Sequence, residues 1–102
     1  MGNWENGNRH GYGVFLFSSG SMYSGEWDND KRTGIGYLNF PGGDMYVGQW
    51  KDNSRIGNGH YFWLNGDRHA GQWKGDNTHG SGVRKNSDGT VRKGQWRYNN
   101  EV

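Results

Sequence analysis

The chain has 102 residues, enough for one domain, and its formal net charge of +2 is too small to indicate a nucleic-acid-binding protein. Because it contains no cysteine, disulfides, thiolate metal sites and cysteine nucleophiles are excluded. No apolar stretch approaches the roughly 20 residues that cross a bilayer, and no signal peptide opens the chain. We therefore expect an intracellular, cytoplasmic protein or an excised part of one.

Tryptophan recurs every 23 residues along the whole chain, at Trp4, Trp27, Trp50, Trp73 and Trp96. Glycine keeps the same period in four further columns, which hold 17 of the 20 glycines. A fixed period of this length is typical of a repeat protein that stacks one small unit. Mean hydropathy is low, at −1.19, but periodic aromatic residues argue against disorder.

The chain opens inside a repeat, because residues 1–10 lack the strand that precedes the Trp position elsewhere. We interpret them as a partial N-terminal repeat, left by an open edge or by a cut from a longer array.

The best-formed unit covers residues 22–43. Residues 22–27 alternate large and polar side chains as a half-buried strand does, residues 28–33 are polar and predict a loop, and residues 34–40 predict a second strand. Pro41–Asp44 has the composition of a turn. Nothing has helical period, so each repeat is predicted to be one β-hairpin, and the fold class to be all-β.

Alternation places Tyr23, Gly25 and Trp27 on one face of the first strand, and we expect Gly34, Gly36, Leu38 and Phe40 of the second strand to share it. Glycine weakens a strand, so its recurrence needs a reason. We expect the glycine columns to make room for aromatic rings, in an elongated single-layer antiparallel sheet of stacked hairpins with about four repeats and partial ends.

The repeat decays toward the C-terminus. The tyrosine column reads Tyr23, Tyr46, His69, Arg92, and the ring column at the end of the second strand reads Phe17, Phe40, Trp63, Asn86. Solenoids need a polar terminal unit, so residues 80–102 are predicted to form a degenerate, basic C-terminal repeat or cap of one domain that covers residues 1–102.

The motif Tyr-x-Gly-x-Trp, followed by a loop, Gly-x-Gly and a glycine-containing turn, resembles the MORN (membrane occupation and recognition nexus) repeat family. Tyr23–Trp27 and Tyr46–Trp50 match this motif closely, and the pairs at Gly11, Gly34, Gly57 and Gly80 fit its second half. The resemblance covers essentially the whole chain. It implies a twisted sheet of hairpins whose function is protein interaction, scaffolding or attachment near membranes, with phosphoinositide binding in some members and attachment to enzymes in others.

A single-layer sheet leaves its rings partly uncovered, which favours a peptide or an amphipathic helix as a ligand. The predicted partner-binding groove comprises Phe17, Tyr23, Trp27, Leu38, Phe40, Tyr46, Trp50, Trp63 and Trp73. Ring-on-ring packing within the stack is the structural alternative for much of this set. The opposite face carries Tyr12, Val14, Leu16, Ile35, Tyr37 and Phe62, a second binding or self-association surface.

Positive charge gathers near the C-terminus. Residues 1–51 have a net charge of −1 and residues 52–102 a net charge of +3. The candidate site for anionic ligands comprises Arg84, Lys85, Arg92, Lys93 and Arg97. Anionic headgroups or an acidic partner would fit it. Protection of a terminal strand by charge is the structural explanation, and we weigh it more heavily.

The sequence indicates no active site. The Gly-x-Gly pairs lack the helix and the Lys-Ser/Thr that phosphate loops require. The histidines at positions 10, 60, 69 and 79 form no short ligand pair, although His60 and His69 flank one hairpin turn and could approach each other.

We therefore expect a non-catalytic module, without cofactor or metal, that binds another protein along the aromatic groove. The alternatives are a membrane-surface module that binds anionic phospholipid through the basic hairpin, and an accessory segment of a larger enzyme. Self-association through the repeat ends or the apolar face is a further option, as is a place beside a membrane or the cytoskeleton.

Overall fold

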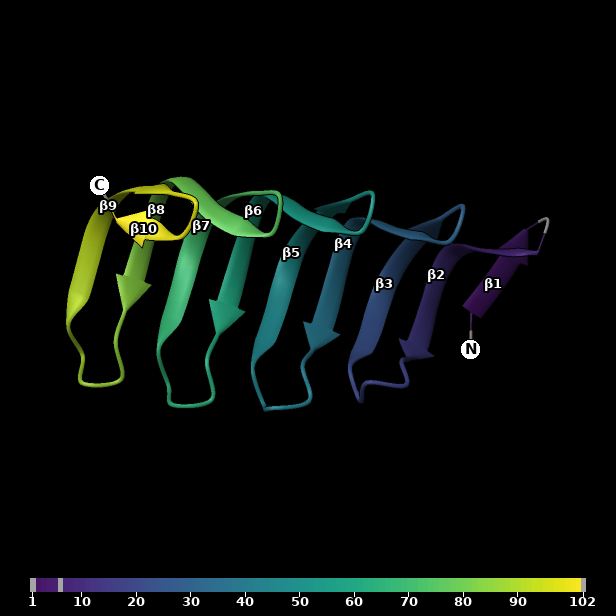
Figure 1. Ribbon diagram of the computed structural model, residues 1–102, viewed down its shortest axis with the longest axis horizontal. Coiled ribbons are helices and arrows are strands. Elements are labelled where there is room, and N and C mark those ends of the chain that lie inside the picture. The colour runs from purple at the N-terminus through teal and green to yellow at the C-terminus, as the bar shows by residue number, and fades with distance from the viewer. Residues whose placement is uncertain (1, 6, 102) are drawn as a thin grey trace.

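The computed structural model describes residues 2–5 and 7–101, with side chains from residue 7 onward. These residues form one ten-stranded antiparallel sheet in which sequence neighbours are always spatial neighbours (Figure 1). The strands are β1 (Gly2–Glu5), β2 (Asn8–Leu16), β3 (Met22–Asp28), β4 (Lys31–Asn39), β5 (Met45–Lys51), β6 (Ser54–Phe62), β7 (Arg68–Lys74), β8 (Asn77–Lys85), β9 (Val91–Arg97) and β10 (Asn100–Glu101). The predicted all-β sheet of stacked hairpins is confirmed.

The molecule is elongated, with extents of 47 × 24 × 17 Å. Antiparallel strands lie about 4.8 Å apart, so each hairpin advances the stack by about 9.6 Å. A length near 47 Å is what ten strands side by side require, and it agrees with the rod expected from the repeat.

The polar segment 28–33, predicted to be a loop, is instead mostly strand. β3 continues through Asp28 and β4 begins at Lys31, so only Asn29 and Asp30 form the turn. Both have left-handed φ values, 48° and 67°, which is the geometry of the two-residue hairpin turn that suits strand twist. The prediction was wrong because polar side chains at the exposed end of a strand resemble those of a loop. Asn29 and Asp30 can form the tight turn because Asn and Asp tolerate positive φ.

The turn at the other end of the strands is confirmed. The Gly43 N–H donates to the Phe40 carbonyl at 3.1 Å, and the Phe40 N–H donates to the Asp44 carbonyl at 2.9 Å. Gly43 has a φ of 103°, which glycine adopts at little cost.

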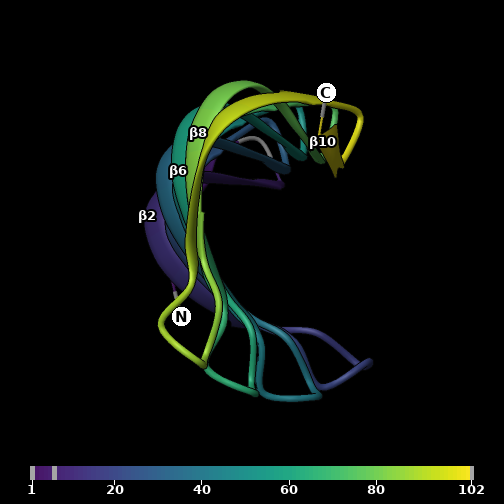
Figure 2. The ribbon, with the colours of Figure 1, turned by 90° about the vertical axis from the view of Figure 1, so that its left-hand side faces the viewer.

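A bulge interrupts the pairing of β1 with β2, β3 with β4, β5 with β6 and β7 with β8. Gly25 pairs with Gly36 but Glu26 pairs with Thr33, so β4 carries extra residues at Gly34 and Ile35. The Glu26 carboxylate accepts the Ile35 N–H freed by this bulge, at 2.9 Å. Glutamine carries out the same role in the next two repeats, where Gln49 accepts from Asn58 and Gln72 from Ser81. Bulges increase strand bend and twist, and viewed along the stack the sheet is a crescent (Figure 2).

The expected sharing of one face is confirmed for Tyr23, Gly25, Trp27, Gly36 and Leu38, which are all buried, and for half-buried Phe40. It was wrong for Gly34, because the bulge turns this residue toward the Glu26 carboxylate on the other face. A Cβ added at Gly25 would lie 2.6 Å from the Gly36 Cα, which means that side-chain directions converge on this face. It is therefore the inside of the bend, and we call it the inner face. A Cβ at Gly36 would collide with the Tyr23 ring, so this glycine column makes room for a ring, as predicted. The close backbone approach at Gly25 was not predicted.

Candidate functional site

The inner face holds the core of the protein. Its buried apolar side chains are Tyr23, Trp27, Leu38, Tyr46, Trp50, Trp73 and Trp96. Their rings pack edge to face along the stack. Tyr46 lies 5.3 Å from Trp50 and 5.2 Å from Trp73, centroid to centroid. Six of the nine side chains predicted to line the groove are therefore buried in the core, where a ligand does not reach them.

Phe17, Phe40 and Trp63, the other three predicted groove residues, are half-buried on this face where the strands meet the longer turns. Phe17 and Phe40 pack against the buried cluster. These three side chains, together with half-buried Phe15 and Tyr61, which were not predicted to line the groove, offer the aromatic surface that a ligand could reach.

Arginine also recurs at the 23-residue period, at Arg9, Arg32 and Arg55, a pattern that sequence reasoning missed. The backbone N–H of Arg32 donates to the Asn53 side-chain oxygen at 2.9 Å, and its Nε donates to the same atom at 3.3 Å. Arg9 with Asp30 and Arg55 with Asp76 repeat this arrangement. Thr78 with Asn99 continues it without the guanidinium.

Each guanidinium lies over a tryptophan of the column. The Cζ-to-ring distances are 4.2 Å for Arg9 over Trp27, 4.7 Å for Arg32 over Trp50 and 5.1 Å for Arg55 over Trp73. Such stacking favours the cation and fixes its plane.

The fourth tryptophan, Trp96, receives its guanidinium from another position of the repeat. Arg84 lies 5.4 Å from this ring and 5.1 Å from Trp63. Residue 78, which is equivalent to Arg55 in the next repeat, is threonine. Arg84 therefore supplies the guanidinium that this repeat would otherwise lack. We call Arg9, Arg32, Arg55 and Arg84 the arginine ladder.

Two of the four guanidinium groups of the ladder form an ion pair with a carboxylate. Arg9 pairs with Asp30 at 2.9 Å, and Arg55 pairs with Asp76 at 3.2 Å. Hydrogen bonds from Arg9 hold the pKa of Asp30 below its ordinary value. Among the described residues, Arg32 and Arg84 have no carboxylate oxygen within 4.0 Å. Burial lowers the pKa of both guanidinium groups.

His69 takes the place of Tyr23 and Tyr46 in its column but does not make their hydrogen bond. The tyrosine hydroxyls donate to the carbonyls of Glu26 and Gln49. His69 accepts at Nδ1 from the Arg84 Nε at 3.3 Å, while its buried Nε2 has no hydrogen-bond partner in the described chain. Burial, followed by the positive charge of Arg84, lowers the pKa of His69 to about 4.

Two hollows open between the steps of the ladder. The first, of about 200 Å³, is lined by Arg32, Leu38, Phe40, Trp50, Asn53, Arg55 and Asp76. The second, of about 240 Å³, is lined by Arg55, Tyr61, Trp63, Trp73, Asp76, Thr78, Arg84 and Asn99. Cationic, aromatic and amide groups thus meet in the same openings along the inner face.

The predicted basic cluster is divided between the two faces. Arg84 and Arg92 face each other across β8 and β9 on the inner face, and Arg92 donates to Glu101 at 3.1 Å. Lys85, Lys93 and Arg97 are exposed on strand positions that alternate with the inner ones. The five charges therefore do not form one patch.

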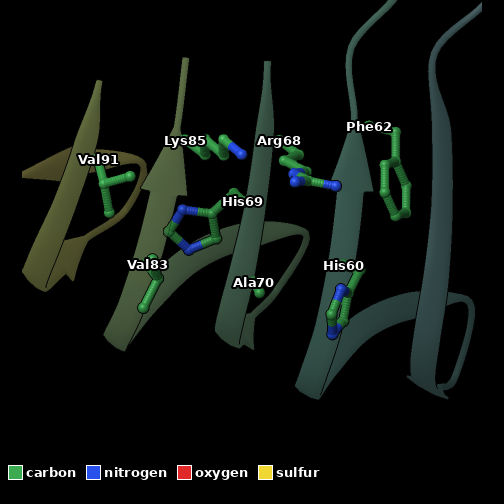
Figure 3. Close-up of a pocket in the computed structure, with 8 residues that line it drawn as sticks. All are labelled: His60, Phe62, Arg68, His69, Ala70, Val83, Lys85 and Val91. Atoms are coloured by element: carbon green, nitrogen blue, oxygen red, sulfur yellow. The ribbon is translucent and has the colours of Figure 1, made fainter. Parts of the chain in front are cut away.

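The outer face is apolar in its N-terminal half, where Tyr12, Leu16 and Ile35 are more than half exposed. Farther along, a hollow of about 280 Å³ opens near Ala70, Val83 and Val91 (Figure 3). Arg68 and Lys85, which are directly opposed across β7 and β8, also line it.

The expected approach of His60 and His69 brings no ligand set together. His60 pairs across the strands with Ala70, whereas His69 pairs with Arg84 on the other face. Among the described residues, no three His, Cys, Asp or Glu side chains gather in a group that could hold a metal ion. In that same part of the chain, no helix is long and apolar enough to cross a membrane.

The MORN repeat family model matches residues 1–22, 23–45, 46–68 and 69–91, four consecutive segments of 22 or 23 residues. The chain belongs to the MORN repeat family. Its repeats are in general non-enzymatic modules that interact with proteins or membranes. No curated protein matches the chain. The matched residues include the Tyr-x-Gly-x-Trp core and all four arginines of the ladder.

The ladder could have been found by applying the period to charged residues. Arg9, Arg32 and Arg55 are 23 residues apart, and so are Asp30, Asn53, Asp76 and Asn99. Arg84 replaces position 78 without any periodic signal, because it belongs to a different position of the repeat and approaches Trp96 from farther along β8.

Proposed function

We propose that this MORN module is a non-catalytic protein-interaction or scaffolding domain that binds a peptide or helix along its inner face. The observation that carries the proposal is the pair of hollows between Arg32, Arg55 and Arg84, each lined by a half-buried aromatic ring. Arginine and aromatic side chains dominate the binding energy of protein interfaces. The surface is also long and single-layered, which suits an elongated segment.

The contacts we propose are Phe17, Phe40 and Trp63 together with the arginine ladder. Tyr46 is 0% exposed and Leu38 is 5% exposed, so substitutions there would test the fold before they tested binding. Phe40→Ser and Trp63→Ser remove accessible rings, and circular dichroism should show that the sheet persists.

Photo-crosslinking tests this surface directly. A crosslinking phenylalanine analogue at Phe40, on the inner face, is compared with the same analogue at Tyr37, which is 38% exposed on the outer face. We expect a discrete protein adduct from native extract at position 40 and none at position 37. Adducts at position 37 alone would contradict the proposal.

A second candidate function is binding of anionic phospholipid at the outer face. Arg68 and Lys85 are directly opposed, an arrangement that is unfavourable without an anion, and Lys93 lies on the same face. Lys85→Glu with Lys93→Glu should abolish co-sedimentation with phosphatidylserine vesicles if this candidate is correct. Unchanged co-sedimentation would reject it, and neither substitution touches the inner face.

A further inference from the structure

The inner face of this module selects a particular kind of segment. Building on the proposed function, we propose that the groove binds a partner segment in polyproline II conformation with a carboxylate at every third residue. The inference depends on the spacing of the arginine ladder, on its two unneutralised steps and on the rings beside them.

The ladder repeats with the hairpins. Trp27, Trp50, Trp73 and Trp96 each carry one guanidinium at 4.2 to 5.4 Å. Hairpins recur about every 9.6 Å along the stack, so a partner that lies along the groove meets equivalent cations at that interval.

Among regular conformations, polyproline II matches this interval best. It advances about 3.1 Å per residue with three residues per turn, so every third side chain returns to the same face after about 9.3 Å. In a β-strand the third residue points to the opposite face. In an α-helix the side chain that returns to the same face closest to this interval is the seventh, after about 10.5 Å. The difference from the hairpin spacing then accumulates with each repeat.

Charge selects carboxylates. Asp30 pairs with Arg9 and Asp76 with Arg55, whereas Arg32 and Arg84 bond to the neutral side chains of Asn53 and His69. The carboxylates of Asp76 and Glu101 attract Arg32 and Arg84 only from beyond 4.0 Å. Arg32 and Arg84 belong to ladder steps two repeats apart, about 19 Å, which six residues of polyproline II span. The Arg84 terminal nitrogens have no hydrogen-bond partner in the described chain, so a ligand carboxylate would meet free donors.

The rings beside the ladder suit the residues between the carboxylates. Phe17 lies 5.8 Å from the Arg32 guanidinium, Phe40 lies 5.8 Å from Arg55, and Trp63 lies 5.1 Å from Arg84. Aromatic-lined grooves bind polyproline II segments well, because these segments lose little conformational entropy on binding. The Arg32 and Arg84 steps thus each offer a cation for an acidic residue, and the rings beside the ladder offer contacts for its apolar neighbours.

The test uses three fluorescein-labelled synthetic peptides and the whole chain, with anisotropy as the readout. The first contains four Pro-Pro-Glu units. The second has the same composition with all glutamates adjacent, and the third is an alanine-rich helix with glutamates seven residues apart. We expect the first to bind at least about tenfold more tightly than either other peptide, because only it meets both Arg32 and Arg84.

Variants locate the binding. Arg32→Gln and Arg84→Gln should each weaken the first peptide about tenfold, while Lys31→Gln and Lys85→Gln, neighbours on the other face with the same charge change, should leave it unchanged. Because Arg84→Gln removes the bond to His69 and could affect folding, Asn53→Asp provides an independent variant. It keeps Arg32 in place but supplies a competing carboxylate, and it should weaken binding as well.

Equal affinity for the first two peptides, or tighter binding of the helical peptide, overturns the inference. If the lysine variants weaken binding as much as the arginine variants, attraction is non-specific and the inference also fails. If none of the peptides binds but the Phe40 adduct forms, the groove function stands and its polyproline II specificity does not. If both binding and the adduct are absent, both proposals fail.

Discussion

His69 provides a test of how the inner face is built, because it stands where other repeats place tyrosine. It is 1% exposed, and burial together with Arg84 lowers its pKa from 6.5 to about 4. The unfolded chain therefore binds a proton between these values that the folded chain does not. Stability should be complete above about pH 6.5 and fall as the pH drops toward 4. At about 1.4 kcal/mol per pKa unit, the loss is about 3 kcal/mol.

The matched variant is His69→Tyr, which restores the column of Tyr23 and Tyr46. Its hydroxyl should donate to the Gln72 carbonyl, as Tyr46 donates to Gln49, and the unpartnered Nε2 disappears. We expect a gain of about 1 kcal/mol near pH 7, since an unsatisfied buried polar atom costs about 1–3 kcal/mol and the Arg84 bond is lost.

Urea unfolding followed by tryptophan fluorescence, at a series of pH values, measures both effects. The difference in free energy of unfolding between variant and wild type should widen as the pH falls. Taking this difference cancels the contributions of the other histidines, which both proteins share. A constant difference from about pH 7 to about pH 4.5 would refute the reasoning, because His69 would then not be held neutral by the fold.

Three further predictions follow from the same geometry. A Cβ at Gly48 would lie 2.5 Å from the Gly59 Cα, so Gly48→Val should destabilise the protein by about 3 kcal/mol in a thermal melt, although valine is the better strand former; an unchanged melting temperature would contradict this. Asn53→Asp should raise the free energy of unfolding by up to about 1 kcal/mol at low salt, by pairing with Arg32, and a gain that persists at high salt would point to another cause. Burial raises the pKa of Tyr23 from 10.0 to about 12, so its stabilising effect should be lost as the pH rises through that window. Absorbance of phenolate should therefore show one late-titrating group fewer in Tyr23→Phe, and identical titrations would contradict the assignment.

The repeat period was enough to predict the architecture, since any 23-residue unit with two alternating strands must stack to bury its one apolar face. It also predicted that Tyr23, Gly25 and Trp27 share that face with Gly36, Leu38 and Phe40, but it placed Gly34 there as well because alternation alone gives no sign of the bulge. The turn at Asn29 and Asp30 was missed because polar composition is the same for a loop and for the exposed end of a hairpin. Side-chain exposure was equally invisible, so buried Trp50 and half-buried Phe40 were predicted to belong to one groove.

What the sequence by itself determined is therefore the periodic part of this protein: the hairpin, the glycine columns and the aromatic core. Only the tertiary structure decided which charges meet. It set Arg92 directly opposite Arg84 and brought Glu101 to Arg92 as an ion-pair partner. It also placed Arg84 over Trp96 where the ladder would otherwise stop at Thr78. A guanidinium on a long side chain can reach one ring from two positions of the same strand, here β8, and that equivalence has no counterpart in the repeat spacing.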